Sequence, residues 1–283
     1  MLFRSGQQEK WELKIRLFSQ SHSIRPKPLN QWNDKVTWIK LYPVNSKKNH
    51  LDAILKIPKF ITIQVVYHVG YGYSNLLLAA LNIASGGLFW WHEPKNLSTF
   101  YERLVDKENQ MTGKIGRVPE LKLGWPPAVL DEAILDQVIN AFAMMPQPYE
   151  PPENSEALNH YMAGIALLAK TDVFTQFEVQ SYGAFISAAK AALRLYRDDL
   201  GTEFPIDIFA LLSSLTVDDA FKKKHSDLIA RYEAHTVTPG LITLSEVAEM
   251  KRICDGLFML AFSKRIQSRA QKDREGDSNS RLD

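Results

Sequence analysis

The stretch "PQPYEPPENSEA" at positions 146–157 divides the chain into two parts of different character. Four of its twelve residues are prolines, and most of the others are polar. Proline lacks the backbone N–H that a continuing helix needs, so no regular element is expected to run through this stretch. We therefore expect an N-terminal domain over residues 1–150 and a second domain over residues 155–268.

The part after this boundary has the pattern of an all-helical domain. Apolar residues recur there every three to four positions, which places them on one side of a helix. In the first such helix they are Leu158, Tyr161, Met162, Ile165 and Leu168. Further helices are expected over 171–199, 205–215 and 217–235. A capping box, in which Thr243 precedes Glu246 by three residues, begins the last helix. The charged segment 269–283 predicts a disordered tail.

The part before the boundary combines strand and helix patterns. Apolar and charged residues alternate in "WELKIRLF" (11–18), which is typical of a half-buried strand. A loop around Pro26 and Pro28 follows it. Further strands are expected over 35–42 and 60–67, and helices over 74–85, 97–105 and 130–145. The predicted fold class is α+β and mainly α, with a small N-terminal sheet and a C-terminal helical bundle.

Composition places the chain among ordinary globular proteins. It has 283 residues, of which 45% are hydrophobic, and a formal net charge of +2, which by itself predicts no nucleic-acid partner. Cys254 is the single cysteine, so an internal disulfide is impossible and no cysteine cluster can bind zinc. We expect a cytoplasmic protein with a reduced, buried Cys254.

The segment from Phe60 to Trp91 contains no Asp, Glu, Lys or Arg and is long enough to cross a bilayer. Polar residues and glycines interrupt it, whereas membrane spans are usually more continuously apolar. A buried core segment is therefore the preferred interpretation, and membrane association through residues 60–91 is the alternative.

Several familiar catalytic motifs are missing from the sequence. "MTGKIG" (111–116) lacks the first glycine and the Ser/Thr of a phosphate-binding loop, and "GYGYSN" (70–75) lacks the last glycine of a dinucleotide fingerprint. No G-x-S-x-G or H-E-x-x-H occurs. We expect neither a cofactor nor a metal site.

One pair of residues remains as a candidate for chemistry. In "RYEAH" (231–235), Arg231 and His235 stand four residues apart, the spacing of neighbours on one face of a helix. Arginine offers a fixed fork of donors for a phosphate, and histidine can move a proton near neutral pH. Together they can hold an RNA phosphodiester and help its 2′-hydroxyl to attack, without a metal ion.

Residues 158–268 resemble a HEPN domain, a helical-bundle family common among prokaryotic RNases, toxins and defence proteins. The similarity lies in "SYGAFISAAKAALRLY" (181–196), in "DLIARYEAHT" (227–236) and in the capped helix "ITLSEVAEMKRICDGLFMLAF" (242–262). Three residues separate Arg231 from His235, where the family usually has four to six. The resemblance implies that Arg231 binds phosphate, that His235 transfers protons, and that two copies form a homodimer with one composite site for RNA.

A non-catalytic reading of the same residues stays open. Arg231 can pair with Asp227 one turn earlier, and His235 can cap the last carbonyls of its helix. A HEPN-like bundle without catalysis would then serve as an interaction or dimerisation module. The nuclease requires Arg231 and His235 to be accessible and adjacent, whereas the module predicts that one of them is buried or ion-paired.

Overall fold

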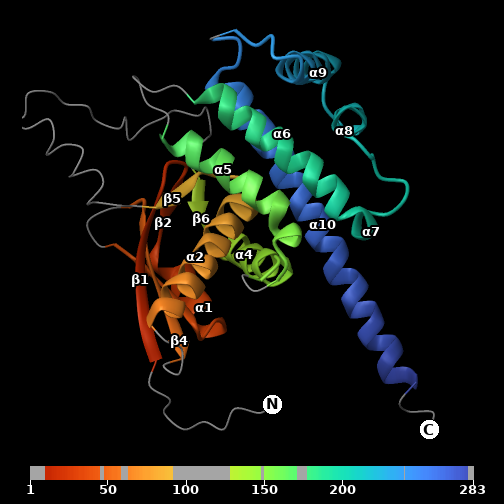
Figure 1. Ribbon diagram of the computed structural model, residues 1–283. Helices are drawn as coiled ribbons and strands as arrows, with labels where there is room; N and C mark the ends of the chain where they lie inside the picture. Colours follow the sequence, from red (N-terminus) through yellow and green to blue (C-terminus); the bar gives the residue numbers. More distant parts are fainter. Residues whose placement is uncertain are drawn as a thin grey trace, which may run out of the picture.

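The computed structural model describes residues 10–44, 48–58, 63–91, 128–147, 150–170, 177–238 and 240–279. They form a mainly helical protein with a small antiparallel sheet near the N-terminus, so the predicted α+β class is confirmed. In Figure 1, helices α2 and α4 lie between the sheet and helices α5, α6 and α10. The helix expected over 97–105 and the segment 111–116 lie outside the described residues.

The sheet is built around the strand with the clearest alternation. Its strands are β1 (Lys10–Ser19), β3 (Ile39–Pro43), β4 (His50–Pro58) and β5 (Phe89–Trp91). Their order is β3–β4–β1–β5, with every neighbouring pair antiparallel. Leu17 of β1 lies opposite Leu51 of β4 and Trp91 of β5, and this register keeps the apolar residues of adjacent strands on one face. A separate parallel pair joins β2 (His22–Ile24) to β6 (Ala128–Leu130).

Helix α1 (Pro26–Lys35) occupies the segment that its two prolines predict to be a loop. Pro26 and Pro28 lie in the first turn, where backbone N–H groups have no acceptor within the helix, so the prolines cost the helix little. Trp32 is buried, and its Nε1 donates to the carbonyl oxygen of Ile39 at 3.2 Å. This helix also shortens the strand expected over 35–42, because β3 begins only at Ile39.

Helix α2 (Ile63–Ser85) is a second correction, because the sequence predicts a strand over 60–67. The missing strand is β4, whose apolar residues Leu51, Ala53 and Leu55 lie on one face and are buried. Short apolar runs such as 60–67 fit a buried strand or a buried helix equally well, and the place of the strand is already taken by β4.

Most of the helices expected after residue 155 are present, but the one helix expected over 171–199 divides at Tyr196, and its residues 171–176 lie outside the described residues. The elements of the helical part are α4 (Glu132–Met144), the 3-10 turn η1 (Pro152–Ser155), α5 (Glu156–Lys170), α6 (Glu178–Leu195), α7 (Arg197–Leu200), α8 (Ile208–Ser214), α9 (Asp219–Glu233) and α10 (Leu244–Asn279). The capping box of the last helix is confirmed, since the Glu246 carboxylate accepts the backbone N–H of Thr243 at 3.0 Å. Helix α10 continues to Asn279, through most of the segment 269–283 whose composition predicts disorder.

One hydrophobic core runs from the sheet through α2 into the bundle. Cys254 is buried in it, as predicted, and its Sγ lies 3.1 Å from the carbonyl oxygen of Phe185. No helix within the described part of the chain is long and apolar enough to cross a membrane.

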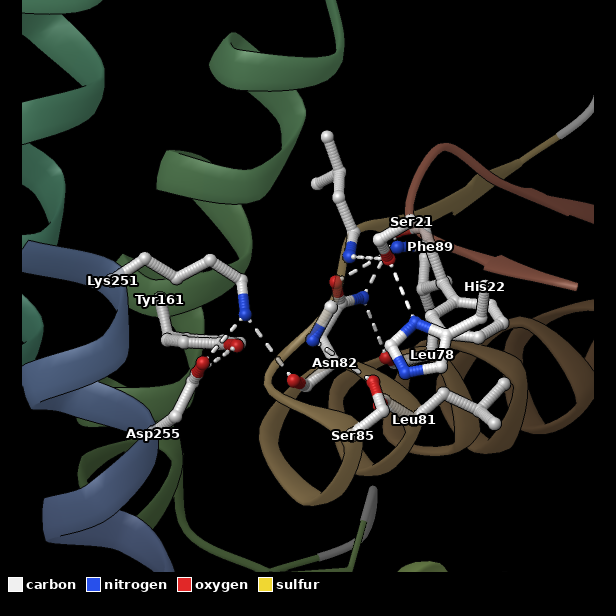
Figure 2. Close-up of polar contacts among 12 residues, drawn as sticks. Ser21, His22, Leu78, Leu81, Asn82, Ser85, Phe89, Tyr161, Lys251 and Asp255 are labelled. Atoms are coloured by element: carbon white, nitrogen blue, oxygen red, sulfur yellow. Dashed lines mark hydrogen bonds and ion pairs between the residues drawn. The ribbon is translucent and has the colours of Figure 1, made fainter. Parts of the chain in front are cut away.

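A buried polar network crosses this core where three helices meet (Figure 2). Lys251 and Asp255 stand one turn apart on α10 and form an ion pair of 2.7 Å with both side chains buried. The hydroxyl of Tyr161 on α5 donates to the other Asp255 oxygen at 2.5 Å, and Lys251 Nζ donates to the backbone oxygen of Asn82 on α2 at 3.2 Å. The Asn82 side chain in turn bonds both backbone groups of Phe89 in β5. The network therefore links α10 to α5, to α2 and to the edge of the sheet.

Burial shifts both members of the ion pair toward their neutral forms. It raises the pKa of Asp255 to about 6, although Lys251 and Tyr161 favour the carboxylate. It lowers the pKa of Lys251, against the attraction of Asp255. Each group therefore depends on its partner to remain charged inside the core.

Asp255→Ala is expected to lower the free energy of unfolding by about 3–5 kcal/mol, because it leaves a buried ammonium without its counter-charge. Urea denaturation measures this change. The double variant Lys251→Met/Asp255→Ala removes the unpaired cation and is expected to be more stable than Asp255→Ala alone. A double variant as unstable as the single one would show that the lost packing, and not the unpaired charge, causes the effect.

Candidate functional site

The structure places Arg231 and His235 at the carboxyl end of α9 and leaves both exposed. Arg231 lies in the last turn of the helix, which ends at Glu233. Within the part of the chain that the structure describes, neither side chain forms a hydrogen bond or an ion pair, so the alternative pairing of Arg231 with Asp227 does not occur. Both groups are open to a ligand from solvent.

His235 lies beyond the helix, in the left-handed conformation with φ 54°. Its backbone N–H donates to the Tyr232 carbonyl at 3.1 Å, and the N–H of Thr236 donates to the Arg231 carbonyl at 2.9 Å. These two bonds define a Schellman motif with His235 at the position that usually holds glycine. Helical geometry ends before His235, so the spacing of four residues does not by itself place its side chain beside Arg231. The turn sets the relative position of the two side chains instead.

A left-handed histidine is costly for the backbone. The conformation costs an L-residue about 1–2 kcal/mol relative to the right-handed one, and glycine avoids most of that cost. Thr236 Oγ1 adds a third bond to the Arg231 carbonyl at 3.2 Å and helps to hold the turn. A strained non-glycine residue at an exposed position is a feature that often accompanies a functional site.

Tyr232, the first residue after the arginine, attaches this end of α9 to α6. A Cβ atom built on Gly183 of α6 would lie 1.9 Å from the Tyr232 hydroxyl oxygen, so the tyrosine ring rests directly against the glycine. Lys190, also on α6, pairs with Glu233 in the last turn of α9. Tyr232 and Glu233 therefore hold the backbone while Arg231 and His235 remain free.

The middle of α9 is attached through a buried histidine that the sequence interpretation missed. "KKKH" (222–225) suggests a solvated face, yet His225 is fully buried. Its Nε2 lies 2.9 Å from a Glu249 oxygen of α10, and its Nδ1 lies 2.9 Å from the Tyr182 hydroxyl of α6. A carboxylate only accepts hydrogen bonds, so Nε2 carries the proton and Tyr182 donates to Nδ1. The available signal was helical spacing, since His225 follows Phe221 by four residues and precedes Leu228 by three.

Burial favours the neutral form of His225 against the pull of the neighbouring carboxylates. Burial lowers the pKa of His225, and the hydrogen bond to Glu249 opposes this shift without reversing it. Burial also disfavours the Glu249 carboxylate, but hydrogen bonds from Lys224 and His225 outweigh it and lower the pKa of Glu249. Lys224 donates to Glu249 at 2.5 Å and lies 3.5 Å from Glu246. Lys224 thus supplies the positive charge that balances the Glu249 and Glu246 carboxylates, and the His225 imidazole stays uncharged.

The start of α9 is capped by Asp218. The Asp218 carboxylate accepts the backbone N–H of Phe221 at 2.6 Å. Asp218 and Asp219 form one of two pairs of adjacent acidic residues, and in the other pair, Asp198 and Asp199, Asp199 binds Arg265 at 2.5 Å. Neither acidic pair therefore contributes to the candidate site.

No cluster of three or more His, Cys, Asp or Glu side chains suited to a metal occurs among the described residues. No family model matches the chain, and neither curated proteins nor solved structures give a match. The likeness of residues 158–268 to HEPN domains therefore stays a prediction.

Gly183→Ala is expected to destabilise the protein by about 1–3 kcal/mol, because its methyl group collides with Tyr232. Gly256→Ala is the matched control, since it is also inside a helix but its Cβ meets no atom within 4 Å. The control is expected to be more stable than the wild type by up to about 1 kcal/mol. Thermal denaturation measures both, and equal effects of the two substitutions would contradict the contact.

The stability that His225 contributes is expected to decline on acidification. Its folded pKa lies below the ordinary value of 6.5, so the unfolded chain takes up the proton first as the pH falls. The difference in unfolding free energy between the wild type and His225→Gln is therefore largest above pH 6.5 and shrinks below it. Asp255 and His22 titrate in both proteins, so their contributions to the unfolding free energy cancel in this difference. A difference that is constant from pH 8 to pH 5 would contradict a buried neutral His225.

Proposed function

We propose that this chain is a metal-independent endoribonuclease of the toxin or defence type, with its site at Arg231 and His235. The observation that carries the proposal is the free exposure of both side chains at a turn whose neighbouring residues are firmly attached. Arg231 is the phosphate-binding group, because its guanidinium offers parallel donors to two phosphate oxygens. His235 is the proton-transfer group.

The reaction divides into one bond formed and one bond broken. His235 removes the proton from the 2′-hydroxyl, whose oxygen then attacks the adjacent phosphorus. The bond from phosphorus to the 5′-oxygen breaks, and that oxygen needs a proton as it leaves. The products are a 2′,3′-cyclic phosphate and a 5′-hydroxyl. A second histidine supplies the leaving-group proton most directly, and a homodimer provides it as His235 of the other copy.

A HEPN-like assignment of residues 155–268 supports this proposal. Helix α6 buries Ala188, Ala189, Ala191 and Ala192, and α10 begins with the capping box of Thr243 and Glu246. The Arg–His turn connects α9 to this capped helix.

A non-catalytic interaction or dimerisation module is the second candidate. It is favoured by the Schellman motif, because His235 occupies a defined structural position at the end of α9. The nuclease and the interaction module predict different effects of a glycine substitution at residue 235.

His235→Gly separates the two roles. Glycine suits the left-handed turn, so this variant is expected to be as stable as the wild type or up to about 1 kcal/mol more stable. If His235 transfers protons, RNA cleavage falls by a factor of about 100 to 10,000. The assay uses a mixed RNA pool in EDTA and identifies cyclic phosphate ends. Arg231→Gln is expected to weaken cleavage as well.

Two residues outside the site provide controls, the half-buried His160 and the exposed Arg269. His160→Gln and Arg269→Gln replace the same residue types on α5 and α10 and are expected to leave cleavage unchanged. RNA left intact by the wild type, or cut equally well by His235→Gly, would contradict the nuclease and favour the interaction module.

A further inference from the structure

A pocket lies between α8, α9 and α10, on the face of α10 that carries Glu249. It is an open pocket of about 550 Å³, within the size range of small-molecule sites. Its walls are mostly apolar and include Leu211, Val217, Phe221, Ile253, Leu257 and Leu260. Val217 and Leu260 remain 43% and 37% exposed, so apolar surface is left open to water at this pocket.

Gly256 leaves room on the α10 wall of the pocket. It lies inside the helix, where glycine costs about 1 kcal/mol relative to alanine. Its backbone is not in the left-handed region, and a Cβ there would meet no atom within 4 Å. Neither backbone conformation nor close packing therefore requires glycine, and the effect of the missing side chain is to keep the pocket open.

Two charged side chains line the pocket, Glu249 and Arg252, and they differ in whether the described residues supply a partner. One oxygen of Glu249 accepts from both Lys224 and His225, so its charge is compensated within the protein. Arg252 lines the same pocket one turn before Gly256, is exposed, and has no hydrogen bond or ion pair among the described residues. Its guanidinium can bind a carboxylate through two parallel hydrogen bonds.

We propose that this pocket binds a small amphiphile, an unbranched apolar chain that ends in a carboxylate. The chain occupies the apolar walls beside Gly256, and the carboxylate binds Arg252 at the rim. This site is separate from the Arg231–His235 turn, and the proposal holds whether or not the chain cleaves RNA.

Dodecanoate is the probe, and the full-length protein is titrated below the micelle concentration. Displacement of a fluorescent dansylated undecanoate reports binding. Saturable one-to-one binding is expected for the wild type. Gly256→Leu fills the pocket from the α10 wall with a better helix former, so it is expected to abolish binding without loss of stability. Arg252→Gln is expected to weaken dodecanoate about tenfold, and Arg269→Gln, the control on the same helix, to leave it unchanged.

Dodecanol tests the carboxylate separately. It has the same chain without the charge, so its affinity is expected to be lower than that of dodecanoate and equal in the wild type and Arg252→Gln. Two results would overturn the proposal: no saturable binding of dodecanoate to the wild type, or binding that Gly256→Leu leaves intact.

Discussion

The structure depends on the need to satisfy a buried lysine and a buried aspartate in the middle of α10. Lys251 is fully buried and Asp255 almost fully, so each requires partners at fixed distances. Those partners come from elsewhere in the chain, Tyr161 from α5 and the Asn82 backbone from α2. A shift of any of the three helices would leave a charged or polar group unpaired. The network therefore fixes how the bundle sits on the sheet, while the surrounding apolar core supplies most of the favourable burial.

Helix α9 is attached to the rest of the bundle through a few specific contacts. His225 joins it to α6 and α10, and Tyr232 joins its last turn to Gly183. This arrangement positions the backbone of the Arg–His turn and leaves the side chains of Arg231 and His235 in solvent. It also leaves open, apolar space between α8, α9 and α10, which is the pocket proposed to bind an amphiphile. Both candidate sites thus follow from the sparse packing of α9 against the bundle.

Local signals in the sequence predicted much of this fold. Alternation identified β1, apolar periodicity identified the bundle helices, and the Thr243–Glu246 spacing identified the start of α10. The errors lie where tertiary context decides. Residues 63–67, which the sequence assigned to a strand, belong to helix α2 because β4 fills the place of the third strand. The two prolines were harmless because they lie in the first turn of α1.

The candidate site was predictable in part. Sequence placed Arg231 and His235 near a helix end, but the left-handed turn at His235 depends on where α9 stops. Burial of His225 was detectable from helical spacing. The Lys251–Asp255 pair was not, because an ion pair at this spacing has the same sequence pattern on an exposed face as in a core.

The most direct test of whether the sheet and the helical bundle form one cooperative unit is the denaturant unfolding of the wild type, followed by two probes. All six tryptophans lie within residues 1–150, so their fluorescence reports the N-terminal part, while far-ultraviolet circular dichroism reports mainly the helices. If the buried network and the continuous core make one cooperative unit, the two transitions coincide at the same denaturant concentration. Loss of tryptophan signal well before loss of helix would contradict that account.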